Sequence, residues 1–307
     1  MSKGVTIAVF MGGDSAEREV SLESGKAAFE AIQKSFTAKS YDIRERTVPE
    51  DVLAECHVVF STLHGLFGED GGMQSLLDAR GISYAGCDAF SSKLCFNKHL
   101  TTERVKSLGM AVTREVLIGK GISVDIRSVV EYLGDDLVMK PNCQGSSVDL
   151  YFTKSEGALQ QILSNVNLAD EWLIQQRVSG RELTVGVFDG EAGGVVEILP
   201  KGGAYDYKSK YTKGMTDYVV PALLDEGLAK KIQESAVSVF HACDCRDWAR
   251  MDYILMPDET FVFLEVNTLP GLTELSLLPM SARALGLSFE SLLAFILKPA
   301  IQRFQKS

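Results

Sequence analysis

The sequence lacks the features that mark several large classes of protein. Acidic residues outnumber basic ones, with 41 Asp and Glu against 31 Lys and Arg, a net charge of −10 and a pI near 5.0. A basic surface for nucleic acid or for an anionic membrane is therefore not expected, and any cations that bind phosphate must be local. No apolar run approaches the length needed to span a bilayer, and the first residues lack the pattern of a signal peptide.

Paired cysteines are missing as well. No CxxC pair occurs, and His241 lies near two of the cysteines without the spacing of a zinc finger. We therefore expect a cytoplasmic protein with reduced thiols and no zinc site at its six scattered cysteines, Cys56, Cys87, Cys95, Cys143, Cys243 and Cys245.

The familiar glycine motifs for nucleotides are also absent. GxxxxGK[ST] does not occur, and GxGxxG is matched so poorly that a dinucleotide site is not expected. A Ser/His/Asp triad or a nucleophilic cysteine is not evident either. What the chain does have is length, since 307 residues are enough for two or three domains that share one cleft.

The first ninety residues follow an α/β pattern. An apolar run at 5–10 ends in a glycine loop, and helical spacing follows from Val20 toward Ile32. A second strand at 57–61 ends in the loop HGLFGEDGG, and a helix at 73–79 and a strand at 82–85 come next. Because ligands bind at the carboxyl ends of strands in open α/β folds, we expect the two glycine loops to meet at one sheet edge.

The pattern changes to a smaller α+β unit after residue 90. Helices are expected at 92–108, 156–163, 226–242 and from 288, and strands at 111–118, 137–140, 172–177, 183–188 and 194–198. No internal repeat is visible. We therefore divide the chain into three units, 1–93, 94–182 and 183–307.

Residues 250–279 hold the most concentrated group of candidate metal ligands. Two β-rich runs, 251–255 and 261–266, flank a turn at 256–259. Glu265 and Asn267 share a face of the second strand, because side chains alternate, and Asp252 lies opposite them in a hairpin. Such oxygen ligands suit Mg²⁺, whereas the plain alternative is a set of edge carboxylates that face water. The apolar run that leads up to Glu265 favours the metal site.

Two lysines and a glutamate are candidates for binding a nucleotide. Lys140 follows an apolar strand and precedes a glycine–serine loop at 142–147, whose N–H groups can approach phosphate. Lys98, taken alone, is more typical of a solvated surface. Glu182 can accept hydrogen bonds from ribose if a purine lies along the preceding strand, although a plain connection between two domains explains this segment equally well.

Together these residues resemble the ATP-grasp family. The match covers, at the spacing or in the order of the family, Asp252, Glu265, Asn267, Lys98, Lys140 and Glu182. The resemblance implies an N-terminal parallel-sheet α/β domain that binds substrate, followed by two α+β subdomains that clasp ATP. It also implies two Mg²⁺ ions, for which Mn²⁺ is a possible substitute, and metal and acceptor sites in the last unit.

Five motifs in one order narrow the resemblance further. They are MGGDSAEREVSLESG, HGLFGEDGGMQSLL, KPNCQGSSV, YDYKSKY and EVNTLPGLTELSLLP, and they span nearly the whole chain. This series resembles the D-alanine–D-alanine ligase family of bacterial peptidoglycan synthesis. The resemblance implies a cytoplasmic, homodimeric, ADP-forming ligase. ATP would phosphorylate the carboxylate of one D-alanine, and the amine of a second D-alanine would attack the acyl phosphate.

The resemblance also implies roles in catalysis. By matching position, Glu17 would hold the ammonium of the first D-alanine, and His64 would lie near its carboxylate. Arg250 and the backbone N–H of Gly271 would stabilise the oxyanions of the reaction. Ser276 would fix the carboxylate of the second D-alanine.

Further matched positions concern the nucleotide and a lid. Lys210 would contact the γ-phosphate and the second substrate, while Ser146 and Tyr211 would order the lid together with Glu17. The remaining nucleotide residues by this match are Lys98 and Lys140 at the α- and β-phosphates, Glu182 at the ribose, and Gln175, Gln176 and Val178 at the adenine.

Several positions depart from the family pattern. Gln175 stands where Glu is common, Asp149 and Asp247 stand where glycine is usual, and Glu274-Leu275 stand where a small residue and His are frequent. These departures do not touch the metal set.

Two alternatives remain open. One is a related ligase that uses D-serine or D-lactate as acceptor, and Tyr211 favours an amine acceptor over D-lactate. The other is a nucleotide-binding protein without turnover. Such a protein is expected to lose one of the four central site residues, all of which are present, namely Arg250, Asp252, Glu265 and Asn267.

Overall fold

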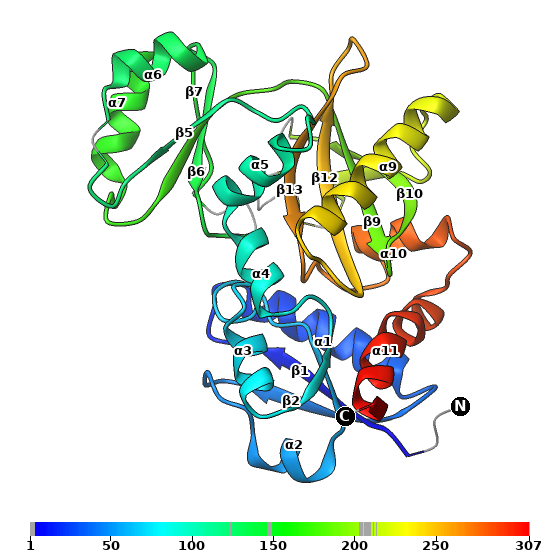
Figure 1. The fold of residues 1–307 in the computed structure, drawn as a ribbon. Coiled ribbons are helices and arrows are strands. Elements are labelled where there is room, and N and C mark those ends of the chain that lie inside the picture. The colour runs from blue at the N-terminus through cyan, green and yellow to red at the C-terminus, as the bar shows by residue number, and fades with distance from the viewer. Residues whose placement is uncertain are drawn as a thin grey trace.

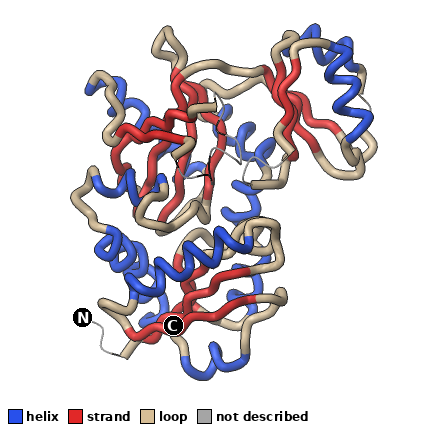
Figure 2. Tube along the Cα trace, turned by 180° about the vertical axis from the view of Figure 1, so that it is seen from behind, coloured by secondary structure: helices blue, strands red, loops and turns tan. Residues whose placement is uncertain are grey.

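The computed structural model describes residues 4–122, 124–145, 149–202, 205, 210, 212 and 214–306. These residues form three sheets, each covered by helices (Figure 1). The N-terminal sheet, blue to cyan, lies below the other two in that view, and Figure 2 shows the same arrangement from behind. Within the described part of the chain, no helix is long and apolar enough to cross a membrane.

The N-terminal unit is a parallel sheet in the order β2-β1-β3-β4. Its elements are β1 (Thr6–Gly12), α1 (Arg18–Ile32), β2 (Thr37–Ile43), α2 (Glu50–Glu55), β3 (Val58–Ser61), α3 (Gly72–Ala79) and β4 (Ser83–Ala85). β1 and β3 are buried on both faces, which is why both strands read as continuous apolar runs. The glycine loops that follow them meet as expected, with Gly65 against the side chain of Ser15.

The sequence analysis missed β2 and α2. β2 lies at the edge of the sheet, and only Ile43 of its sequence TAKSYDI is buried. Its pairing with β1 runs from Thr6↔Thr37 to Gly12↔Ile43. Backbone hydrogen bonds to β1 therefore define this strand, and a mostly polar composition gives no sign of them.

The central unit is an antiparallel sheet in the order β5-β8-β6-β7. Its elements are β5 (Glu115–Ile118), α6 (Ile126–Leu133), β6 (Leu137–Pro141), β7 (Tyr151–Thr153), α7 (Glu156–Asn165) and β8 (Trp172–Gln176). Met139 and Ile174 pack with the two helices in one core. Because side chains alternate, Lys140 and Gln175 lie on the opposite face of the sheet.

The single helix expected at 92–108 is wrong. The structure has two helices, α4 (Ala89–Phe96) and α5 (Lys98–Lys106), separated by Asn97 in an extended conformation. The Asn97 side chain accepts a hydrogen bond from the backbone N–H of Leu100 at 3.0 Å and so caps α5. Lys98 is therefore the first residue of α5, and its backbone N–H donates to the carbonyl of Asn142 at 3.2 Å. The break brings the lysine to the loop after β6.

The C-terminal unit contains an antiparallel sheet in the order β11-β10-β9-β12-β13. Its elements are β9 (Arg181–Phe188), β10 (Glu191–Pro200), β11 (Thr216–Val219), α9 (Glu226–Ala242), β12 (Trp248–Leu255), β13 (Phe261–Asn267), α10 (Leu277–Arg283) and α11 (Phe289–Lys306). Met251 and Tyr253 pack with α9 on one face. Alternation therefore turns Arg250 and Asp252 to the other face.

The last helix returns to the beginning of the chain. α11 packs on α1, β3 and β4, and its residues share a core with the N-terminal sheet (Figure 1). The division at residues 93 and 182 stays a prediction. By its packing, α11 belongs with the N-terminal sheet rather than with the rest of 183–307.

Four cysteines that are far apart in the sequence meet in one core. Cys87, Cys95, Cys243 and Cys245 are buried together, and the Sγ atoms of Cys95 and Cys245 are 3.8 Å apart. All six cysteines are free thiols. In the described ranges, no group of three or more His, Cys, Asp or Glu side chains is arranged to hold a metal ion.

Candidate active site

Two adjoining cavities gather the predicted site residues. The first, of about 290 Å³, lies between the central and C-terminal sheets and is lined by Lys98, Lys140, Gln175, Gln176, Val178, Glu182, Lys210, Asp252 and Glu265. The second, of about 580 Å³, lies between the C-terminal sheet and the N-terminal loops and is lined by Glu17, His64, Lys210, Arg250, Asn267, Gly271 and Ser276. Lys210 lines both cavities. Ser146 and Tyr211 lie outside the described residues.

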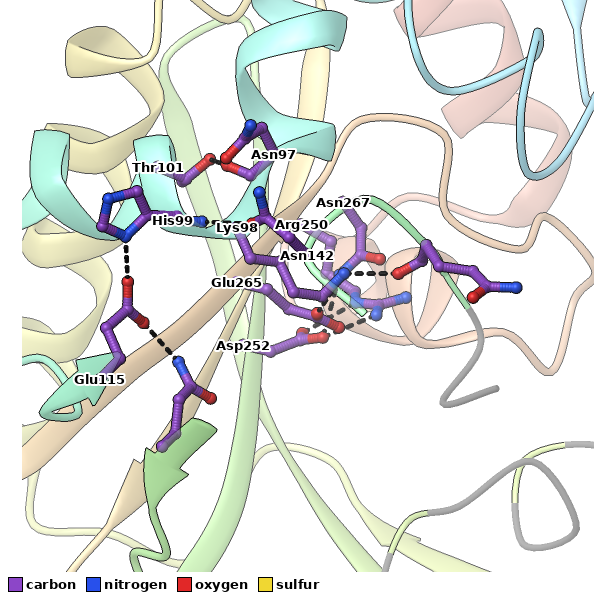
Figure 3. Close-up of polar contacts among 12 residues, drawn as sticks. Asn97, Lys98, His99, Thr101, Glu115, Asn142, Arg250, Asp252, Glu265 and Asn267 are labelled. Atoms are coloured by element: carbon purple, nitrogen blue, oxygen red, sulfur yellow. Dashed lines mark hydrogen bonds and ion pairs between the residues drawn. The ribbon is translucent and has the colours of Figure 1, made fainter. Parts of the chain in front are cut away.

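The hairpin of β12 and β13 forms the boundary between the two cavities. Its register places Asp252 opposite Glu265, as the sequence predicted, and Arg250 opposite Asn267 (Figure 3). The Arg250 guanidinium donates to both carboxylate oxygens of Asp252, at 2.9 and 2.7 Å, and Asn267 Nδ2 donates to Asp252 Oδ2 at 3.0 Å. Pairing with Asp252 holds the charge of Arg250 in a buried position.

The ligand set is one that fits a hard cation. It consists of two carboxylates, Asp252 and Glu265, and the amide of Asn267, whose oxygen accepts no hydrogen bond from the described residues. Oxygen ligands of this kind suit Mg²⁺, which is bound by one or two carboxylates together with substrate phosphates. A cation is adjacent, since Lys98 Nζ lies 3.9 Å from Glu265 Oε2.

The lysines determine the protonation of Glu265. Burial acts to raise the pKa of this carboxyl group, but Lys98, Lys140 and Lys210 outweigh it and hold the pKa at about 2. In return, burial lowers the pKa of Lys140 to about 8, Lys98 acts in the same direction, and Glu265 opposes the shift. The cavity thus contains an ionised carboxylate among cations.

Glu182 lies on β9, beside β12. Burial raises the pKa of its carboxyl group to about 7, although Lys210 acts in the opposite direction. Two residues further along the same face of β9, Thr184 donates to Asp252 Oδ1 at 2.5 Å. β9 therefore presents the carboxyl group of Glu182 to the first cavity, and its Thr184 hydroxyl holds the candidate metal ligand Asp252.

His64 is the central polar residue on the N-terminal side of the second cavity. Its Nδ1 lies 3.7 Å from Glu69 Oε1, and both side chains are largely buried. Burial acts to lower the pKa of His64, but Glu69 and Glu17 outweigh it and raise the pKa above its usual value. The buried Nε2 has no hydrogen-bond partner among the described residues, so it is available to a ligand in the cavity.

Ser276 and Gly271 lie on the other side of the second cavity, in the segment between β13 and α10. The backbone N–H of Thr273 donates to Ser276 Oγ at 2.9 Å, and the Thr273 hydroxyl lies at the same distance from it. Lys210 and Tyr205 line the same cavity, and Lys210 Nζ lies 5.1 Å from the ring centroid of Tyr205. The serine is thus held in place by its own loop.

Two of the unusual aspartates have a common explanation. Asp149 and Asp247 both adopt a positive φ, of 54° and 61°. Glycine adopts this conformation at least cost, and Asp is among the few other residues that tolerate it. The loops therefore keep the backbone shape for which glycine is usual.

Sequence reasoning missed two supporting residues. Glu69 pairs with His64, and it could have been found because it lies five residues later in the motif HGLFGEDGG. Thr184 supports Asp252 only because β9 pairs with β12, with Asp252 opposite Thr184. No signal in the sequence reveals that pairing.

Known proteins resemble this chain over most of its length. Residues 37–87 match the family model described as D-ala D-ala ligase N-terminus, and residues 105–298 match D-ala D-ala ligase C-terminus. The D-alanine–D-alanine ligase of Syntrophotalea carbinolica is 40% identical over 303 residues, covering 97% of this chain and 96% of the relative. The corresponding ligase of Thermotoga petrophila is 39% identical over 303 residues, covering 96% and 97%.

Solved structures of the same kind resemble the whole chain. The ligase from Bacillus anthracis complexed with ATP has a TM-score of 0.83 and 25% identity, covering 99% of both chains. A D-Ala:D-Ser ligase from Enterococcus faecalis has a TM-score of 0.84 and 28% identity, covering 96% of this chain and 99% of that one. The expected ATP-grasp fold, an N-terminal α/β unit followed by α+β units, is confirmed. The chain belongs to the D-alanine–D-alanine ligase family.

Proposed function

We propose that this chain is an ADP-forming carboxylate–amine ligase that uses ATP to join two D-alanine molecules for peptidoglycan synthesis. The observation that carries the proposal is the pair of adjoining cavities with Lys210, Arg250, Asp252 and Glu265 at their boundary. A nucleotide in the first cavity would direct its terminal phosphate toward the second. Two small amino acids in the second would lie next to each other.

The first cavity is assigned to ATP. The B. anthracis relative was solved with this nucleotide. Lys98, Lys140 and Lys210 supply positive charge for the phosphates, and Glu182 supplies an acceptor for the ribose hydroxyls. The purine would lie along β8 and the residues after it, where Gln175, Gln176 and Val178 line the cavity.

Asp252, Glu265 and Asn267 are assigned to two Mg²⁺ ions, with Mn²⁺ as a possible substitute. The support is the oxygen donor set and the neighbouring lysines. When bound, the ions would neutralise charge on the phosphates and orient the terminal phosphate. Thr184 and Arg250 hold Asp252 in place for that purpose.

The second cavity is assigned to the two substrates. The carboxylate of the first D-alanine would attack the γ-phosphate and give an acyl phosphate and ADP. The amine of the second would then attack the acyl carbon, and phosphate would leave. This chemistry requires positioning and charge stabilisation more than covalent help from the protein.

The roles implied by the family match suit the side chains present. Glu17 is a buried anion suited to the ammonium of the first D-alanine, and His64 offers its buried Nε2 to the carboxylate. Arg250 and the N–H of Gly271 would stabilise the oxyanions, as donors fixed before the reaction begins. Ser276 would hold the carboxylate of the second D-alanine. We also propose that Ser146 and Tyr211 order a lid over the site, and this proposal rests on the resemblance to the family alone.

The experiment that tests the proposal measures ADP release with Mg·ATP and D-alanine, with L-alanine as the control. Rapid release and formation of D-alanyl-D-alanine would support it. Absence of turnover with every D-amino acid, despite ATP binding, would favour a nucleotide-binding protein without catalysis.

A further measurement should identify the second substrate, the acceptor. A D-Ala:D-Ser ligase resembles this chain as closely in fold as a D-alanine–D-alanine ligase does. Adding D-serine or D-lactate to D-alanine identifies the preferred acceptor. Turnover only with such a mixture would keep the mechanism and change the specificity.

We also propose, from the resemblance to the family alone, that the protein is a homodimer in the bacterial cytoplasm. Light scattering on purified protein tests the dimer, and cell fractionation tests the location.

A further inference from the structure

Three polar side chains form a continuous hydrogen-bonded chain that ends at the first cavity. His99 Nδ1 lies 2.7 Å from Glu115 Oε1 (Figure 3), and Gln175 Nε2 donates to Glu115 Oε2 at 2.7 Å. His99 is on α5, Glu115 on β5 and Gln175 on β8. We call these three residues the amide relay.

The relay is built into the fold rather than lying on its surface. Glu115 and Gln175 are directly opposite each other in the pairing of β5 with β8, so their side chains share one face of the sheet. The Gln175 residue is 4% exposed and the Glu115 side chain 6% exposed. Both oxygens of the buried carboxylate are hydrogen-bonded, which compensates for its removal from water.

The carboxylate decides which way the amide faces. An ionised carboxylate only accepts hydrogen bonds, so the NH₂ group of Gln175 must be directed at Glu115 and its oxygen must be directed elsewhere. That oxygen accepts no hydrogen bond from the residues that the structure describes, and the side chain lines the first cavity. A neutral amide without such a neighbour could turn over and present its NH₂ group instead.

We propose that Glu115 and His99 are positioning residues that lock the Gln175 amide with its oxygen toward the nucleobase and thereby make the site selective for a 6-aminopurine. The inference rests on the proposed binding of ATP in this cavity. Adenine offers a donor at position 6, which the locked oxygen accepts. A 6-oxopurine, as in inosine or guanosine nucleotides, offers an acceptor there and would face the oxygen without a hydrogen bond.

The relay also accounts for glutamine at a position where the family commonly has glutamate. A carboxylate at 175 would lie directly across from that of Glu115, and like charges in that arrangement repel. In this chain the negative charge lies on the neighbouring strand β5, at Glu115, and the Gln175 amide lies between that carboxylate and the cavity. Gln175 and Glu115 are therefore a matched pair.

The test compares kcat/KM for ATP with that for inosine 5′-triphosphate. In Glu115→Gln the neighbour is an amide that can donate or accept, so Gln175 is free to turn. We expect the preference for ATP to fall about tenfold, the value of one hydrogen bond, with most of the change in KM. His99→Leu should lower the preference for ATP about threefold. Because His99 is partly exposed, this variant can be measured even if Glu115→Gln does not fold.

Asp170→Asn is the matched control. Asp170 also accepts from a side-chain amide, that of Asn167 at 3.1 Å, and this exposed pair has no hydrogen bond to Gln175, Glu115 or His99. Any effect there should apply equally to both nucleotides. An unchanged preference in Glu115→Gln and His99→Leu would overturn the proposal, as would an equal loss of preference in Asp170→Asn.

Exchanging the two residues provides a second test. Gln175→Glu alone should raise the KM for ATP at least tenfold, because two carboxylates then face each other. Adding Glu115→Gln should return the KM to within about threefold, since the new amide donates to the new carboxylate. A double variant no better than Gln175→Glu would overturn the idea of a matched pair.

Direct binding separates this inference from the proposed function. If the natural protein binds ATP more tightly than inosine 5′-triphosphate by calorimetry and the relay variants reduce the difference, the relay stands even without ADP release. If ADP release depends on D-alanine but the preference never changes, the ligase function stands and the relay is wrong.

Discussion

At the scale of single residues, the cavity shared by the central and C-terminal sheets sets the charge of each group it contains. Glu265 stays ionised because three lysines surround it. Burial raises the pKa of Glu182 to about 7, because fewer cations offset the removal of this carboxyl group from water. The pKa values of two glutamates in the same sheet are therefore shifted in opposite directions, and the consequence of each shift can be measured.

Glu265→Gln should reduce turnover at least a hundredfold, and it should also lower the free energy of unfolding at neutral pH, because Lys98, Lys140 and Lys210 lose the negative charge that they surround. The substitution keeps the shape and removes the negative charge proposed to hold two cations. Steady-state ADP release measures the effect. Glu259→Gln, at the exposed turn of the same hairpin, is the control and should retain activity. Near-normal turnover in Glu265→Gln would remove this residue from the metal site.

Glu182→Gln should stabilise the protein without ligands at pH 8 but not at pH 4.5. The carboxyl group has a folded pKa of about 7 against an ordinary value of 4.5, so the folded state binds more protons than the unfolded state between these values. This group's contribution to stability therefore falls as pH rises from 4.5 to 7. We expect a gain of about 2 kcal/mol at pH 8, allowing for partial screening by solvent. Urea titrations at the two pH values test this, and an equal gain at both would contradict it.

At the scale of elements, the short break between α4 and α5 positions a candidate phosphate-binding lysine. A continuous helix was the natural expectation, because the sequence over 92–108 has no proline or glycine before Gly109. The cap made by Asn97 and the hydrogen bonds of Lys98 and His99 to Asn142 favour the break instead. The loop after β6 thereby fixes where α5 begins.

Asn97→Ala should cost about 1 kcal/mol of stability and also raise the KM for ATP several-fold. The first effect is the loss of a helix cap, and the second is the displacement of Lys98. Asp125→Ala removes an equivalent cap, at α6, where it accepts from the N–H of Arg127. That control should lose similar stability but keep its KM, and equal KM values in the two variants would contradict a positioning role for the break.

The predictions for regular elements succeeded where apolar periodicity is strong. β1, β3, α9 and the hairpin of β12 and β13 were expected within a few residues of their bounds, because each presents a buried face. β2 was missed because an edge strand is defined by its neighbour. The metal set was expected on one face of the hairpin because alternation in a strand is local, and the register confirms that geometry.

At the scale of the whole molecule, an ion pair between the partly buried Arg303 and the buried Asp247 joins the end of the chain to the strand that carries the site. Arg303 on α11 donates to both oxygens of Asp247, at 2.8 and 2.6 Å, and to the carbonyl of Tyr84. Asp247 also accepts from the N–H of Gly86 at 2.8 Å and lies just before β12. The N-terminal sheet, α11 and β12 are thus connected at one point.

Arg303→Leu should destabilise the protein by about 3 kcal/mol, because it leaves the carboxylate of Asp247 buried and unpaired. Asp247→Asn in the same chain should recover at least half of the loss, since Asn tolerates the positive φ and still accepts from Gly86. Urea unfolding measures both. A double variant as unstable as Arg303→Leu alone would show that the unpaired charge is not the cause.

The sequence by itself determined the types of the main elements, the order of the motifs and the local face shared by Glu265 and Asn267. These properties depend on residues a few positions apart, where helical and strand periodicity act directly. Only the tertiary structure decided that His99, Glu115 and Gln175 form a relay, that Arg303 pairs with Asp247, and that α11 packs on the N-terminal sheet. These contacts join residues that are 16, 60 and 56 positions apart, and they depend, like the packing of the last helix on the first sheet, on how elements pack and pair. That arrangement is not encoded in any local pattern of residues.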